Sequence, residues 1–329
     1  MRGWIRGLGL RAVMSGVWMG LSAFSPPAKE VDLALQEGGT ASWEIAAMQE
    51  LKLDSRNEIK LKIRNVADSK AGQVALQAGK VDVILSDFIW ASLQRDQGAD
   101  FTIVPHSLAV GGLMVLPDSK VKSVADLKGA TLAVAGGPVD KSYLMLQAYY
   151  NAQTGGDLTQ DASTTFGAPP LVNEQLLGGQ ADASLNFWHF NARAAVAGAT
   201  ELISVQEIMQ ELGVSKTPPL LGWVFSEAYA AKEPEAIQRF LDASFQTKAA
   251  LMTDDALWEK IRPAMNVDDD ALFLALRDAY RAGIVEGYSD ADIQAAIEAY
   301  AVMAKFGGAD LTGGSDGLAD GTFWSGYRK

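Results

Sequence analysis

The sequence predicts an α/β protein with two lobes, each built on a mostly parallel sheet that helices cover on both faces. First, apolar strand-like runs alternate with helix-like segments from residue 31 onward, as parallel sheets require. Second, a helix–Gly–x–x–Asp–strand–aromatic segment at 75–90 recurs at 175–190. Third, an apolar strand that ends in two glycines occurs at 31–39 and again at 131–140. This internal similarity indicates two equivalent halves.

The first 25 or so residues differ from the rest of the chain. Arg2, Arg6 and Arg11 precede the uncharged run AVMSGVWMGLSAF, which ends in small residues and prolines. This run is too short to cross a bilayer, which needs roughly 20 apolar residues. A basic start, a short apolar middle and small residues predict a secretory signal peptide over residues 1–25, cleaved within 22–28. A buried N-terminal helix is the alternative.

The overall composition is that of a globular protein, and it excludes several classes of function. At 48% hydrophobic and 21% charged residues, the chain can bury a sizeable core. Its net charge of −12 argues against a nucleic-acid partner and against an anionic membrane surface. The absence of cysteine excludes disulfides, thiolate metal sites, a cysteine nucleophile and a lipid-anchored cysteine. With the leader, these features predict a protein of the bacterial periplasm.

The first half starts with a strand at 31–36 that stops at two glycines. The pattern then predicts, in order, a helix at 42–53, a strand at 59–64, a helix at 69–79, a strand at 81–85 and a strand near 101–104. The sequence SLAVGGLMVLP, around residue 110, is strand-like and is not a Ser/Pro/Gly-rich linker. We therefore expect the chain to cross directly into a second lobe there.

The second half repeats the alternation. Strands are expected at 113–116, 131–135 and 182–186, and helices at 140–152 and 171–178; Ser123 can cap a short helix with Asp126. Residues 201–219 are expected to be a connection, followed by a returning strand at 220–225. The predicted lobes are therefore 30–110 with 222–329, and 113–220. Two independent halves followed by a helical tail are the alternative.

The C-terminal part is predicted to be helical and amphipathic to about residue 306. Residues of the N-cap type stand at the expected helix starts, and glycines stand at two expected helix ends. The N-caps are Asp254, Asp268 and Ser289, and the C-caps are Gly283 and Gly307. The glycine-rich segment after 307 is expected to be mostly loop.

Four stretches together resemble a known family. They are KSVADLKGATLAVAGGPVDKSYLMLQAYY, ALQAGKVDVILSDFIW, LGGQADASLNFWHFNARAAVAG and GWVFSEAYAAKEPEAIQRFLDA. In this order they resemble the periplasmic substrate-binding proteins of ABC importers, in the group for nitrate, sulfonates, taurine and thiamine precursors. The resemblance implies a type II-like periplasmic-binding-protein fold, with a ligand cleft between two closing lobes. It also implies a monomer that captures a small organic molecule or oxyanion and docks on a membrane permease driven by a cytoplasmic ATPase.

Four turns are the candidate ligand contacts, because ligands bind beyond the carboxyl ends of strands in open parallel sheets. Glycines there let the backbone approach a ligand, and the helices that follow direct N–H groups outward. The alternative is that these are only tight turns. The candidates are Gly38, Gly39, Thr40, Ser86, Asp87, Gly136, Gly137 and Asn186.

Aromatic residues at the same strand ends are the candidate walls of the cleft. Trp90 and Trp188 end the two matching segments, so facing lobes would bring both toward one gap. Trp43 stands in the first turn of its helix, and His106 lies close to the crossover. Each of these side chains could be part of a core instead, and the sequence leaves open whether His106 or His189 faces the cleft.

No cofactor or metal is expected, and the protein is not expected to be an enzyme. Two histidines are too few for a histidine metal site, and the aspartate clusters lack the spacing of a calcium loop. No Walker, Gly-x-Ser-x-Gly or His-Glu-x-x-His motif occurs. Two alternatives stay open: an enzyme on the same fold, like a thiamine-precursor synthase, and a periplasmic protein that binds a metal or chelate. The lack of cysteine argues against the first.

The sequence does not identify the ligand. No arginine stands at the four turns, and Lys141 is the nearest cation. A strongly charged oxyanion usually needs an Arg or Lys clamp. Several tryptophans beside Asn, Ser and Thr suit a flat or partly apolar molecule somewhat better.

Overall fold

The computed structural model describes Met1 and residues 28–328. Apart from Met1, the signal peptide predicted at 1–25 lies outside the described residues. Within the described part of the chain, no helix is both long and apolar enough to cross a bilayer.

The first lobe is built on a five-stranded sheet. Its strands are β1 (Lys29–Gln36), β2 (Ile59–Val66), β3 (Val83–Asp87), β4 (Phe101–Ser107) and β10 (Leu221–Ser226), in the order β2-β1-β3-β10-β4. β1 pairs in parallel with β2 and β3, whereas β10 is antiparallel to β3 and β4. Thus β1, β3 and β4 present their carboxyl ends at one edge.

The second lobe repeats this arrangement. Its strands are β5 (Gly112–Val115), β6 (Thr131–Ala135), β7 (Ser163–Gly167), β8 (Ala183–Asn186) and β9 (Thr200–Ser204), in the order β7-β6-β8-β5-β9. In each sheet the fourth strand in this order is antiparallel to its neighbours: β10 in the first sheet and β5 in the second. In both cases the chain reaches this strand from the other lobe. The predicted two-lobed α/β fold with mostly parallel sheets is confirmed.

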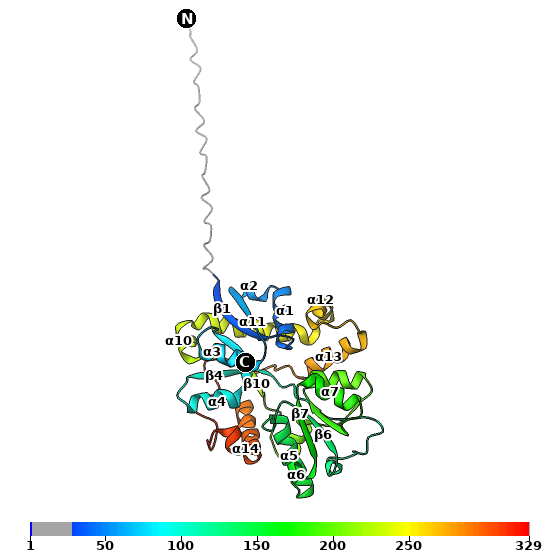
Figure 1. The fold of residues 1–329 in the computed structure, drawn as a ribbon. Helices are drawn as coiled ribbons and strands as arrows, with labels where there is room; N and C mark the ends of the chain where they lie inside the picture. Colours follow the sequence, from blue (N-terminus) through cyan, green and yellow to red (C-terminus); the bar gives the residue numbers. More distant parts are fainter. Residues whose placement is uncertain (2–27, 329) are drawn as a thin grey trace.

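Helices flank both sheets, as Figure 1 shows. Around the first sheet lie α1 (Ala41–Glu50), α2 (Leu53–Arg56), α3 (Ser69–Gln77), α4 (Phe88–Asp96), α10 (Glu227–Lys232), α11 (Pro234–Thr253), α12 (Asp255–Met265) and α13 (Asp270–Ala282). The second lobe carries α5 (Lys141–Thr154), α6 (Leu158–Asp161), α7 (Pro169–Leu177), α8 (Trp188–Val196) and α9 (Val205–Glu211), with a short 3₁₀ helix at Val124–Leu127. The last helix is α14 (Asp290–Thr312).

Three expectations need correction. Residues 201–219 are not a plain connection, since they contain β9 and α9, which starts at a capping box between Ser204 and Glu207. The N-cap of α13 is Asp269 rather than Asp268, because the Asp269 carboxylate accepts the Leu272 N–H. The segment after Gly307 is not all loop: the first helical part of α14 ends at Gly308, next to the C-cap expected at Gly307, and a second helical part runs to Thr312, where Gly313 caps it.

α14 connects the two lobes. In the part of α14 before its kink at Gly308, Asp292 pairs with Lys216 at 2.5 Å, and Glu298 accepts the Ser215 N–H at 2.7 Å. Both partners lie in the segment that follows α9. Beyond the kink, the chain returns to the first lobe, where the Thr322 carbonyl accepts the N–H of Ile103 in β4 at 2.8 Å. Figure 1 shows α14 beside both α4 and α5.

The kink in α14 lies at Gly308, whose φ of 51° and ψ of −149° fall in a region that is essentially restricted to glycine. A Cβ added there would meet no atom within 4 Å, so any penalty would come from the backbone. We expect Gly308→Ala to lower the free energy of unfolding by about 1–3 kcal/mol. Urea denaturation measures this.

The matched control is Gly317→Ala, where a Cβ also meets nothing and φ is not positive. Its effect should stay within about 0.5 kcal/mol. Equal effects of the two substitutions would contradict a conformational requirement at Gly308.

Candidate functional site

An ion pair joins the strand-end turns of the two lobes. Lys141, the first residue of α5, places its Nζ 3.3 Å from Oδ2 of Asp87, the last residue of β3. Both side chains are largely buried. The other Asp87 oxygen accepts the Trp90 N–H at 2.9 Å and so caps α4. One carboxylate therefore starts a helix of the first lobe and holds a cation of the second.

The electrostatics around Lys141 favour its charged form. Burial lowers the pKa of Lys141, but the neighbouring carboxylates of Asp87 and Asp140 outweigh this and raise it above its ordinary value. Burial raises the pKa of Asp140, although its carboxylate accepts the N–H groups of Ser142 and Tyr143. The Lys141 ammonium thus already faces two acids of this chain.

Aromatic rings make a second contact between the lobes. The rings of Trp43, in α1, and Trp188, at the start of α8, meet edge to face with centroids 5.9 Å apart. Tyr280 of α13 lies 6.0 Å from Trp43 and 6.1 Å from Trp188. Trp43 is buried, whereas Trp188 is only partly buried. These three rings form a junction between the first lobe and α8.

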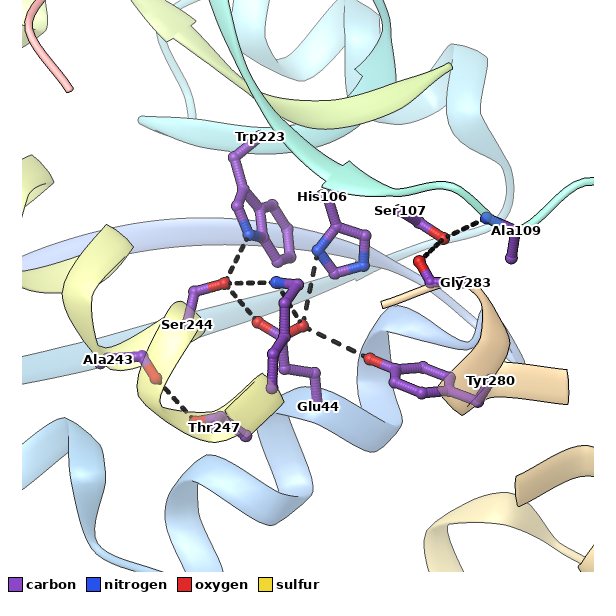
Figure 2. Close-up of polar contacts among 11 residues, drawn as sticks. Glu44, His106, Ser107, Ala109, Trp223, Ala243, Ser244, Thr247, Tyr280 and Gly283 are labelled. Carbon is purple, nitrogen blue, oxygen red and sulfur yellow. Dashed lines mark hydrogen bonds and ion pairs between the residues drawn. The ribbon is translucent and has the colours of Figure 1, made fainter. Parts of the chain in front are cut away.

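A buried polar cluster is centred on Glu44, the residue that follows Trp43 in α1 (Figure 2). Glu44 is fully buried, and its Oε2 lies 2.7 Å from the Lys248 ammonium. Its carboxylate also accepts the hydroxyls of Ser244 and, at 3.4 Å, Tyr280. Ser244 in turn accepts the indole N–H of Trp223 at 3.0 Å. One carboxylate therefore connects α1, α11 and α13.

His106 borders this cluster at the end of β4. Its Nδ1 lies 3.5 Å from Glu44 Oε2 but has no hydrogen-bond partner among the residues that the structure describes, and its ring packs edge-on against Trp223 at 4.7 Å. Burial, together with the charge of Lys248, lowers the pKa of His106 well below its usual range. The imidazole is therefore neutral at physiological pH and is part of the lobe's polar interior.

The other predicted site residues fall into two groups. Asn186 donates to the Pro169 carbonyl and to Asn173, both at 2.9 Å, and its oxygen accepts the Phe187 N–H. Ser86 is buried and contacts the amide of Gln73. Both side chains are thus engaged inside their own lobes.

The turn residues Gly38, Gly39, Thr40, Gly136 and Gly137 form the second group. Gly38 and Gly136 have φ of 69° and 88°, which explains the glycines. The Thr40 side chain makes no capping bond to α1, although it occupies the N-cap position. A ligand contact by these five residues stays a prediction.

Trp90 does not occupy a position equivalent to that of Trp188. Its ring stacks on Phe101 at 5.5 Å within the first lobe. At the constant offset of the repeat, the counterpart of Trp188 is Phe88, which is fully buried. Side chains two residues apart on a helix point in directions that differ by roughly 200°. Trp90, the third residue of α4, therefore faces a different way from Trp188, the first residue of α8.

Sequence reasoning missed Glu44, Ser244, Lys248 and Tyr280. A signal was present, because Glu44 and Lys248 are single charges inside the otherwise uncharged stretches ASWEIAAM and FQTKAALM. A charge on the buried face of a helix needs a partner. Among the described residues, no cluster of three or more His, Asp or Glu could hold a metal ion.

We expect Lys248→Met to destabilise the protein strongly, because it leaves the Glu44 carboxylate buried without its counter-charge. Removing one member of a buried ion pair typically costs about 3–5 kcal/mol. Chemical denaturation measures the loss, and the double variant Glu44→Gln/Lys248→Met should recover part of it. Lys260→Met is the control, since it breaks an exposed pair with Glu50 worth about 0–1 kcal/mol. Equal losses for the two lysines would refute the role of the buried pair.

The low pKa of His106 also predicts how stability depends on pH. The unfolded chain binds a proton near the ordinary pKa of 6.5, while the folded protein keeps His106 neutral. Protons therefore favour the unfolded state, and stability falls as pH drops below that value. Between about pH 7 and about pH 5.5, His106→Gln should lose about 1 kcal/mol less stability than the wild type. His189, whose pKa burial lowers to about 4, contributes equally in both proteins. Parallel pH profiles would show that His106 titrates normally.

Comparisons with known proteins agree with this architecture. Three binding proteins are among the solved structures that share the fold. The alkanesulfonate-binding protein SsuA from Xanthomonas axonopodis pv. citri bound to MOPS has a TM-score of 0.69 and 19% identity, over 91% of this chain and 99% of that chain, and the periplasmic aliphatic sulphonate binding protein SsuA from Escherichia coli has a TM-score of 0.66 and 21% identity, over 87% and 92%. The periplasmic nitrate-binding protein NrtA from Synechocystis PCC 6803 has a TM-score of 0.59 and 11% identity, over 77% of this chain and 70% of that chain. No curated protein sequence matches the chain.

The family comparison covers most of the chain. The model described as NMT1/THI5 like matches residues 55–255, which include β2 to β10 and therefore strands of both sheets. The protein belongs to the NMT1/THI5-like family.

Proposed function

We propose that this protein is the extracytoplasmic solute-binding component of an ABC transporter. It captures a small molecule between its lobes and delivers the molecule to a membrane permease. The family and the fold shared with sulfonate- and nitrate-binding proteins support this function. The observation that carries it is the pair of contacts between the lobes, Asp87–Lys141 and Trp43–Trp188, at strand ends where such sheets bind ligands.

The remaining parts of the proposal follow from this function. The lobes comprise 30–110 with 222–329, and 113–220. The protein carries a signal peptide at 1–25, resides in the periplasm and acts as a monomer without a cofactor. Its partner is an inner-membrane permease with a cytoplasmic ATPase.

The groups around Lys141 indicate which class of ligand the cleft would accept. An oxyanion at this ammonium would compete with Asp87 and Asp140. The rings of Trp43, Trp188 and Tyr280 offer apolar faces beside it. A flat or partly apolar organic molecule with a hydrogen-bonding edge therefore suits the cleft better than a compact, strongly charged anion.

A thermal-shift screen of the purified protein tests the function. Sulfonates, nitrate, pyrimidines and metal chelates are added separately, and the melting temperature is followed. A ligand that binds only the folded state raises this temperature, and the increase keeps growing with the logarithm of the ligand concentration above the dissociation constant. The compound that stabilises the protein is then incubated with it. Recovery of the compound unchanged supports a binding protein, whereas turnover would establish an enzyme.

We expect Trp188→Ala to weaken binding of that compound about tenfold to a hundredfold, because burying an aromatic face contributes about 1–3 kcal/mol. Affinity and ligand-free melting temperature are measured together. Trp324→Ala is the control, since that ring packs against Phe225 on the first lobe and should leave affinity unchanged. A loss of about 3–5 kcal/mol in stability with unchanged affinity would instead make Trp188 a core residue.

A further inference from the structure

A groove separate from the contacts described above runs along α5, between that helix and α14. It consists of two adjoining cavities of about 380 and 350 Å³, a size typical of small-molecule sites. Gln147, Thr159 and Phe306 line both cavities. The four residues of the contacts Asp87–Lys141 and Trp43–Trp188 do not line either one, although Pro138 and Val139, which follow the turn residues Gly136 and Gly137, line the second.

Gln147 places an unused amide in this groove. Its side chain is 8% exposed, and no described residue forms a hydrogen bond with it. It is also not among the polar atoms sealed from solvent, so its amide opens into the cavities that it lines. Water that enters the groove can therefore bond to this amide, and an occupant that displaces the water has to replace its hydrogen bonds. The position therefore favours an occupant that can both donate and accept hydrogen bonds.

The other lining groups narrow the chemistry of the occupant. Phe306 contributes to both cavities, and Phe166, packed edge-on against Tyr143 at 5.2 Å, is 39% exposed. These rings provide apolar faces. The charged residues are Asp157 and Asp310 against Lys305, so the lining does not attract an anion.

We propose that this groove is a second binding site, for a small neutral ring compound with several hydroxyl groups, such as a monosaccharide or cyclic polyol. A hydroxyl is both donor and acceptor, which matches the Gln147 amide. The C–H face of such a ring packs against Phe306. The site is independent of the ligand that the cleft carries.

Nuclear magnetic resonance of the full-length, ¹⁵N-labelled protein tests the proposal with D-glucose, D-ribose and myo-inositol as probes. Substitution identifies the side-chain amide signals of Gln147. At least one probe should shift these signals in a saturable way. Gln147→Leu should weaken that probe's binding about tenfold, the effect of losing one buried hydrogen bond. Gln153→Leu is the matched control, because Gln153 lies on α5 but is exposed and outside the groove.

The outcomes separate clearly. Saturable shifts that weaken in Gln147→Leu but persist in Gln153→Leu support the site. If Gln147→Leu does not fold, Phe306→Leu takes its place, and it should weaken the same probe because it removes the ring. Absence of saturable shifts with all three probes, or equal binding by the groove variants, overturns the proposal. Shifts confined to the indole signals of Trp43 and Trp188 also overturn it, because the probe would then occupy the cleft.

Discussion

The buried ion pair between Glu44 and Lys248 is the interaction on which the first lobe's side of the cleft depends. Two charges with almost no solvent access are tolerable only when each is the other's partner. Because Glu44 also accepts the hydroxyls of Ser244 and Tyr280, α1, α11 and α13 are held in one arrangement. Trp43 precedes Glu44 on α1, and Tyr280 lies on α13. The aromatic surface that meets Trp188 is therefore placed by charges that are buried inside the first lobe.

The connections between the lobes set the limits on their relative movement. The chain enters the second lobe at β5 and returns to the first at β10, so the first lobe is built from two stretches of chain that the second lobe separates. α14 and the chain that follows it add a third connection, through Asp292–Lys216 to the second lobe and through Thr322–Ile103 to the first. The lobes can change their angle only if all three connections adjust. Of the three connections, the one through α14 lies furthest along the sequence from β5 and β10. Gly308, with its glycine-specific conformation, lies in this connection.

The repeat in the sequence predicted the architecture well, because strand–turn–helix patterns with a constant offset reflect equivalent places in two sheets. It predicted the side chains of the site less well. Asp82 and Asp182 do keep equivalent roles, each accepting a backbone N–H of the neighbouring strand. Beyond the strands, however, a shift of two residues turns Trp90 into the first lobe while Trp188 faces Trp43. The isolated charges of Glu44 and Lys248 are a signal in the sequence, but their pairing is not, since the partners of Glu44 lie two hundred residues or more away.

The charges at the lobe junction have a consequence for selectivity. Lys141 is the cation nearest the strand ends, and its charge is balanced by Asp87 and Asp140 of the same chain. A small anion would gain its attraction but would also have to overcome the repulsion of two carboxylates at close range. A polar, uncharged group can accept a hydrogen bond from the same ammonium without this repulsion. Together with the rings of Trp43 and Trp188, this balance favours recognition by shape and stacking over recognition by net charge.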